Sequence, residues 1–211
     1  MRNILCFGDS NTFGTNPGGG RWLRNERWTG ILQELLGPDA YVIEEGHGGR
    51  TMIFDDPLEQ DKNGRDQLRV ALRSHRPLDV VILMLGTNDM KHRFQMLPVD
   101  LAAAAGQLGR LVERYDYGEA FPVPKVMLIS PIELGEGVSR SYVSGFSEDA
   151  VQISRQLGPL YRAQAEAYGW LFLDAAAVAR PSGRDKVHME KEGHLALAQA
   201  IAPVLKKEFG W

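Results

Sequence analysis

The sequence predicts an α/β protein, built as a three-layer αβα sandwich around a five-stranded parallel sheet. Short apolar runs alternate along the chain with segments in which apolar residues recur at helical spacing. The run "LDVVILMLG" at 78–86 is nearly all apolar, as expected of a strand that helices cover on both faces. The 211 residues show no evident linker, internal repeat or low-complexity segment, so we expect a single domain over 1–211.

Five short apolar runs predict the strands of the sheet. In chain order, the predicted strands are 3–8, 40–46, 78–86, 125–130 and 170–175. Between and after them, apolar residues at helical spacing predict five helices. These are 26–37, 65–75, 99–115, 149–169 and a last helix that begins near Glu190.

Glycine and proline residues set the expected limits of several helices. Gly37 suits the end of the first helix, and Pro98 suits the start of the third. Pro159 is expected to kink or split the helix at 149–169, and Pro203 to bend the last helix.

Composition excludes several classes of function. The chain has 24 basic and 27 acidic residues, and its basic residues are scattered, with the largest groups at 73–76 and 91–93. These groups are too short for a phosphate-tracking surface, so we expect no nucleic-acid partner. No apolar run approaches the roughly 18 residues of a membrane span. The N-terminal apolar stretch is too short for a signal peptide, so we expect a cytoplasmic protein or a processed mature form.

The single cysteine, Cys6, excludes an internal disulfide and a cysteine-based metal site. It stands among apolar residues, which favours a buried, unreactive thiol. The stretch "HMEKEGH" at 188–194 offers no strong third ligand and lacks the zinc-protease spacing, so we predict no metal. We also predict no cofactor.

Polar residues follow four of the predicted strands. Right-handed crossovers place the carboxyl ends of all parallel strands at one edge of the sheet, where ligands bind. The polar stretches are "GDSN" at 8–11, "EEGHGGRT" at 44–51, "GTND" at 86–89 and "DKVH" at 185–188. Together they supply a hydroxyl, a histidine, an acid and hydrogen-bond donors, which are the groups that acyl transfer requires.

Each stretch also has a simpler structural interpretation. Ser10 could cap a helix, and Gly48 and Gly49 could only turn the chain. Asn88 could hold a turn, and a lone histidine such as His188 is more often structural. The occurrence of all four stretches, each at a separate strand end and in this order, favours the catalytic interpretation.

This order resembles that of the SGNH hydrolases, also called GDSL-type esterases, which have a flavodoxin-like fold. The resemblance rests on Gly8-Asp9-Ser10, the turn around Gly49, Gly86-Thr87-Asn88-Asp89 and Asp185-Lys186-Val187-His188. The chain looks most similar to the arylesterase and acyltransferase subgroup. The stretches that carry this likeness are 25–32, 42–51, 53–57, 78–89 and 123–131. No Gly-x-Ser-x-Gly elbow occurs, which argues against the α/β-hydrolase fold.

We expect Ser10 to attack an ester carbonyl and His188 to accept the Ser10 proton. Asp185 stands three residues before His188, where its carboxylate can orient the imidazole. The Ser10 N–H is an expected oxyanion donor, and the resemblance adds the Gly49 N–H and the Asn88 amide. We assign Asp9 to the structure of the turn.

The predicted substrate pocket is apolar. Its candidate residues are Asn11, Phe13, Trp22, Met52, Phe54 and Phe94, although any of the large apolar ones could equally belong to the core. Asn11 stands where the family name expects leucine, a change that bears on the turn and the pocket wall.

The subgroup resemblance implies small acyl esters, such as acetyl esters of aryl or alkyl alcohols, with acyl transfer to alcohols as a further reaction. A sugar O-acetyl ester and a thioester are the alternative substrates. A different class, a non-catalytic flavodoxin-like module that binds an anion at 8–11, would leave Asp185 and His188 unexplained.

The stretch at 131–147 fits neither helical nor strand periodicity, and long irregular segments are usually functional. It holds Tyr142 and Phe146 among glycine and serine, which suits a contact surface. We expect it to pack against a neighbouring subunit and to narrow the entrance to Ser10. The subgroup resemblance implies a closed homo-oligomer, such as an octamer.

Overall fold

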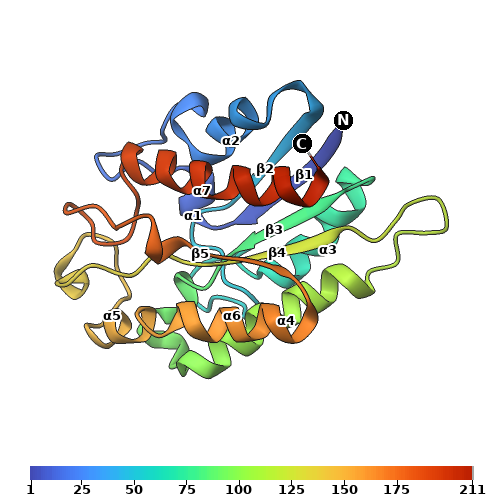
Figure 1. The fold of residues 1–211 in the computed structure, drawn as a ribbon. Helices are drawn as coiled ribbons and strands as arrows, with labels where there is room; N and C mark the ends of the chain where they lie inside the picture. The colour runs from blue at the N-terminus through green and yellow to red at the C-terminus, as the bar shows by residue number, and fades with distance from the viewer. Residues whose placement is uncertain (211) are drawn as a thin grey trace.

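The computed structural model describes residues 1–210 and shows five parallel strands in one sheet (Figure 1). The strand order is β2-β1-β3-β4-β5. The strands are β1 (Arg2–Gly8), β2 (Ala40–Gly46), β3 (Val80–Met84), β4 (Lys125–Ser130) and β5 (Leu171–Asp174). The predicted α/β class and parallel sheet are therefore confirmed.

Helices cover both faces of the sheet. The α-helices are α1 (Ser10–Phe13), α2 (Trp28–Leu36), α3 (Gly64–His75), α4 (Pro98–Arg114), α5 (Asp149–Ser154), α6 (Leu157–Tyr168) and α7 (Lys191–Phe209). Helices α2 and α7 lie side by side over one face, and α3, α4 and α6 lie over the other (Figure 1). This arrangement gives the three layers that the sequence predicts.

Two apolar layers explain why β3 is almost entirely apolar. Val81 and Leu83 contribute to the layer beneath α3, α4 and α6, whereas Val80 and Ile82 contribute to the layer beneath α2 and α7. Successive side chains of a strand point to opposite faces, so a central strand covered on both sides has no solvent-facing position. All five β3 residues are buried. The strand is shorter than the predicted 78–86, since the chain turns away after Met84.

The predicted helix at 149–169 is divided into α5 and α6. The break falls at 155–156, and Pro159 occupies the first turn of α6. A proline in a continuous helix would clash with the carbonyl four residues earlier, here that of Arg155. The predicted split is confirmed. Pro203 lies inside α7, which continues through it.

The segment 131–147 is irregular apart from a 3₁₀ turn at Val138–Arg140. Phe146 is buried in the apolar layer of its own chain, so the expectation that it forms part of a contact surface is wrong for this residue. Tyr142 is 66% exposed. Cys6 is fully buried, and burial raises the pKa of its thiol, as expected for an unreactive cysteine. Within residues 1–210, no helix has the length and apolar character needed to cross a membrane.

Candidate active site

The register of the sheet brings three strand ends together. Gly8, the last residue of β1, pairs with Gly46 of β2 and with Met84 of β3. The polar turns that follow these strands therefore start side by side at one edge. Ser10, Gly49 and Asn88 belong to these three turns.

Ser10 is the first residue of α1, and the preceding Asp9 fixes the start of this short helix. The Asp9 carboxylate accepts a hydrogen bond of 2.9 Å from the backbone N–H of Asn11. Gly8 is required by space, because an added Cβ would lie 2.1 Å from Thr12 Oγ1 and 2.8 Å from the Met84 carbonyl oxygen. The strand thus passes into α1 without a side chain in the way, and Ser10 is displayed at the sheet edge.

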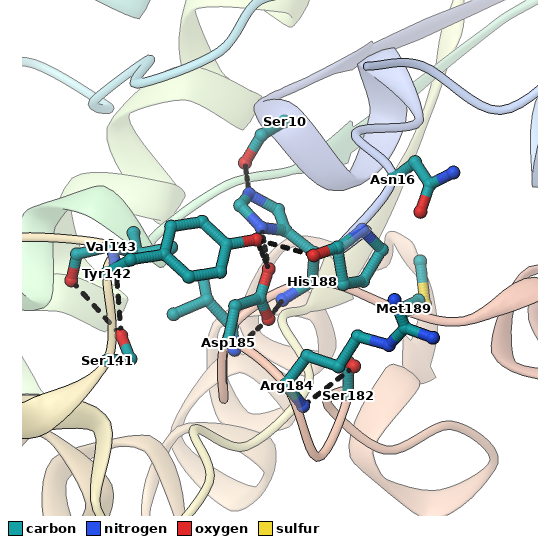
Figure 2. Close-up of polar contacts among 12 residues, drawn as sticks. Ser10, Asn16, Ser141, Tyr142, Val143, Ser182, Arg184, Asp185, His188 and Met189 are labelled. Atoms are coloured by element: carbon teal, nitrogen blue, oxygen red, sulfur yellow. Dashed lines mark hydrogen bonds and ion pairs between the residues drawn. The ribbon is translucent and has the colours of Figure 1, made fainter. Parts of the chain in front are cut away.

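Asp185, His188 and Ser10 form a continuous hydrogen-bonded chain (Figure 2). His188 Nδ1 lies 2.6 Å from Asp185 Oδ2, and His188 Nε2 lies 2.8 Å from Ser10 Oγ. With the Nδ1 proton donated to the carboxylate, Nε2 is free to accept the hydroxyl proton of Ser10. All three residues are nearly or fully buried.

Asp185 is held as an anion by its surroundings. Burial by itself would raise the pKa of this carboxyl, but the hydrogen bonds from His188 and from the backbone N–H groups of Val187 and His188 outweigh it and lower the pKa. Asp9 differs, because burial raises its pKa in spite of the hydrogen bond from Asn11. The carboxylate that contacts His188 Nδ1, at 2.6 Å, is that of Asp185.

Asn11 ties α1 to the segment that carries His188. Its side-chain Nδ2 donates to the Val187 carbonyl at 3.2 Å, and its Oδ1 accepts from the Met189 N–H at 3.0 Å. Both bonds lie in the interior. The side chain thus holds the residues on either side of His188, and the expectation that Asn11 lines the substrate pocket stays a prediction. Leucine could not make these bonds.

The turn that contains Gly49 is connected to the other two strand ends. The His47 N–H donates to the Gly8 carbonyl at 3.1 Å, and the Asn88 side-chain amide donates to the Arg50 carbonyl at 3.1 Å. Gly49 has a φ of +78°, a conformation that favours glycine. Asn88 therefore lies beside the Gly49 turn, and its amide group has a second N–H to offer.

Two buried charged residues to which the sequence analysis gave no individual role brace these turns. Arg50 donates to the Gly8 carbonyl at 2.8 Å and also to the Glu45 carbonyl, and burial lowers its pKa to about 10. Asp89 accepts from the Met52 N–H at 2.9 Å, and burial raises its pKa to about 7. Both belong to the polar stretches at 44–51 and 86–89, but no local pattern predicts that their side chains are buried.

The aromatic residues predicted for the pocket separate into two groups. Phe54 and Phe94 stack with ring centroids 6.1 Å apart. Phe13 lies beneath the Arg21 guanidinium, and Trp22 donates to the Met189 carbonyl at 3.2 Å, next to His188. Met52, a further candidate, is fully buried in the core and was wrongly expected to line a pocket.

His188 and His194 do not share a site. His194 is buried on α7, where its Nδ1 faces the Trp28 N–H at 3.4 Å, while His188 faces Ser10. Burial lowers the pKa of His194 to about 4, so it is a neutral core residue at physiological pH.

Comparison with known proteins decides the family. The model of the GDSL-like lipase/acylhydrolase family matches residues 6–196. The chain belongs to this family. The match spans all four polar stretches and confirms the resemblance that the sequence motifs indicate. No curated protein matched the chain at a significant level.

Solved structures of two esterases agree with the whole fold. Est24, a carbohydrate acetylesterase from Sinorhizobium meliloti, is 35% identical with a TM-score of 0.94, over 99% of this chain and 100% of that one. The aryl esterase of M. smegmatis is 36% identical with a TM-score of 0.91, over 98% of this chain and 99% of that one. The chain is thus similar over its full length to esterases of two kinds.

Proposed function

We propose that this GDSL-type hydrolase is a serine esterase that hydrolyses small acyl esters, of acetyl size, of aryl or simple alkyl alcohols. The observation that carries the proposal is the chain of contacts from Asp185 through His188 to Ser10, at 2.6 Å and 2.8 Å. The aryl esterase and carbohydrate acetylesterase similarities support an ester as the substrate class.

In the proposed acylation, Ser10 Oγ attacks the ester carbonyl carbon while His188 Nε2 takes the hydroxyl proton. The imidazolium that forms is stabilised by the Asp185 carboxylate at Nδ1. His188 then gives the proton to the departing alkoxide, which leaves as an alcohol, and the acyl group remains on Ser10. A water molecule, activated by the same imidazole, attacks the acyl-enzyme and releases the acid. An alcohol in place of water would give acyl transfer.

The developing oxyanion is assigned to three donors: the backbone N–H groups of Ser10 and Gly49 and the side-chain amide of Asn88. Ser10 begins α1, where backbone N–H groups have no acceptor within the helix. The Asn88 amide is held beside the Gly49 turn by its bond to the Arg50 carbonyl. Each such donor contributes roughly 2.7–4 kcal/mol of transition-state stabilisation.

A carbohydrate O-acetyl ester is the second candidate substrate. It is favoured by the likeness to Est24, a carbohydrate acetylesterase, at a TM-score of 0.94. Sugar and aryl acetates require the same acyl site and differ only in the alcohol, so one protein can be tested on both.

A fluorophosphonate probe and a hydrolysis profile test the proposal. We expect covalent labelling at Ser10, and rates on p-nitrophenyl esters that fall from acetate through butyrate to octanoate. Acetylated xylose measured in parallel shows which alcohol is preferred. Absence of labelling, together with reversible binding of an anion, would instead support a non-catalytic module.

A further inference from the structure

The hydroxyl of Tyr142 reaches out of the segment 131–147 to two acceptors elsewhere in the chain. It lies 2.7 Å from the carbonyl oxygen of Pro17 and 3.3 Å from Asp185 Oδ2 (Figure 2). Tyr142 is 66% exposed, whereas Asp185 is fully buried. A surface loop is thus in direct contact with the carboxylate that orients His188.

We propose that Tyr142 is a positioning residue for the Asp185–His188 pair, which it holds through the Asp185 carboxylate. This inference rests on the proposed function. It also gives the irregular segment after β4 a role within its own subunit.

The hydrogen bonds to Asp185 show what the Tyr142 hydroxyl adds. Oδ1 accepts from the backbone N–H groups of Val187 and His188, at 3.0 Å and 2.9 Å. Oδ2 accepts from His188 Nδ1 and lies within reach of Tyr142. The Tyr142 hydroxyl has one proton, which it shares between the Pro17 carbonyl at 2.7 Å and Asp185 Oδ2 at 3.3 Å, so the bond to Oδ2 is the weaker of the two. A carboxylate oxygen accepts about two hydrogen bonds, and Tyr142 occupies the remaining position on Oδ2. The contact opposes rotation of the carboxylate away from the imidazole.

The surroundings of the Tyr142 hydroxyl keep it protonated, so that it can donate a hydrogen bond. Burial and the negative charge of Asp185 raise the pKa of Tyr142, so its proton stays on at physiological pH. The other charged groups that act on the hydroxyl are Arg184 and Glu190, of opposite sign. Two further titratable groups interact electrostatically with His188: Asp9, which precedes α1, and His194 of α7.

The contact with Pro17 extends the effect to the Ser10 side of the site. Pro17 belongs to the turn after α1, in which the Asn16 N–H donates to the Gly20 carbonyl at 3.0 Å. Tyr142 therefore joins three segments: the turn that follows α1, the loop that follows β4 and the loop that carries Asp185. The Gly135 N–H donates to the Lys186 carbonyl at 2.8 Å, so the backbone already joins the loop after β4 to the loop that carries Asp185. Tyr142 adds a side-chain contact that also reaches the turn after α1.

Removal of the hydroxyl has a consequence that loss of loop rigidity alone would not produce. A hydrogen bond to Oδ2 disperses the negative charge of Asp185 and weakens its hold on a protonated imidazole. Without it, the protonated and inactive form of His188 persists to higher pH. The acidic limb of the rate profile of a Tyr142→Phe variant then moves to higher pH.

The experiment compares wild type, Tyr142→Phe and Ser139→Ala. Ser139 is a matched control on the same segment, because its hydroxyl anchors the loop to Glu148 at 2.5 Å and it has no contact with Asp185 among the described residues. For each protein, kcat/KM on p-nitrophenyl acetate and the rate of fluorophosphonate labelling are measured from pH 5 to pH 9. Thermal unfolding confirms that each variant is folded.

For Tyr142→Phe we expect the acidic limb to shift upward by about half a pH unit. At the plateau we expect a loss in kcat/KM of about threefold to tenfold, since the pair is less well oriented. Ser139→Ala should leave the limb in place. An unshifted limb in Tyr142→Phe, or the same shift in Ser139→Ala, would overturn the inference while the esterase activity stands. A wild-type protein that neither hydrolyses the ester nor is labelled would overturn the proposed function and this inference together.

Discussion

Ser10 Oγ and His188 Nε2 are 2.8 Å apart, although 178 positions separate the two residues in the chain. Ser10 is placed by the end of β1, and His188 by the loop that precedes α7. Asn11, next to Ser10, makes hydrogen bonds to the backbone on both sides of His188. Two features therefore fix the position of Ser10 relative to His188: the end of β1 at the sheet edge and the buried side-chain amide of Asn11.

Replacement of Ser10 or His188 by alanine is expected to abolish most esterase activity without unfolding the protein. The two side chains act as one unit, so the double variant should lose about as much as either single variant, roughly a thousandfold or more in kcat. Steady-state kinetics on p-nitrophenyl acetate, with circular dichroism for the fold, measures this. A folded Ser10→Ala protein that kept about a tenth of the wild-type kcat would exclude the assigned nucleophile.

Asn11→Leu is expected to lower both stability and activity. The substitution leaves the Met189 N–H and the Val187 carbonyl without their buried partner. Each lost partner costs about 1–3 kcal/mol, so we expect the free energy of unfolding in urea to fall by about 2–4 kcal/mol. Asn25→Leu, at an exposed position, is the control and should change stability by about 0.5 kcal/mol or less. Equal effects of the two substitutions would contradict the assigned role of Asn11.

Asn88→Ala is expected to reduce kcat far more than it raises KM. The amide is proposed to bind the oxyanion of the transition state, which the ground-state ester lacks, and a loss of about a hundredfold in kcat follows. The variant also loses the bond to the Arg50 carbonyl, so its thermal unfolding should be recorded alongside. A change confined to KM would instead make Asn88 a residue that binds substrate.

Asp89 is expected to make the folded protein less stable as pH rises from about 4 to about 7. Burial raises the pKa of this carboxyl to about 7, while the unfolded chain has the ordinary value of 3.8. Between these values the folded state holds a proton that the unfolded state has lost. The contribution of Asp89 to the free energy of unfolding is therefore complete below about pH 4, and it is lost as the pH rises from about 4 to about 7. The size is about 4 kcal/mol across the whole range.

Urea unfolding of wild type and Asp89→Asn at pH 5 and pH 8 measures this contribution. The amide mimics the neutral carboxyl at all pH values, so the variant should lack the decline with pH. His194 acts in the opposite direction, because its pKa is lowered to about 4 and its stability contribution grows as pH rises. It is present in both proteins, so the difference between them isolates Asp89. The same pH dependence in both would show that Asp89 is ionised in the folded state.

Strands and helices were predictable where periodicity is strong. The strand at 40–46 and the strand at 125–130 have the predicted limits. The second of these is buried at every position after Lys125, as expected of a parallel strand covered on both faces. The strand predicted at 78–86 is shorter by two residues at each end. Leu78 and Leu85 lie outside the strand but are apolar and buried, and composition cannot separate a buried residue in a turn from a buried residue in a strand.

The burial of individual apolar side chains was not predictable. Met52 was a candidate for the pocket and Phe146 for a contact surface, yet both lie in the apolar layer beneath α3, α4 and α6. Each belongs to an irregular segment, and such a segment has no fixed period that would assign a side chain to one face. Phe54, in the same stretch as Met52, remains 37% exposed.

Local sequence patterns were enough to predict the alternation of strands and helices. They were also enough to place Ser10, Gly49, Asn88 and the Asp185–His188 pair in the stretches that follow strands. These are local properties, since hydrophobic period and turn residues act over a few positions. Tertiary structure alone decided that Asn11 holds both flanks of His188 and that Tyr142 reaches Asp185. Those contacts join loops distant in the chain, and their geometry depends on how the helices pack on the sheet, which no local pattern encodes.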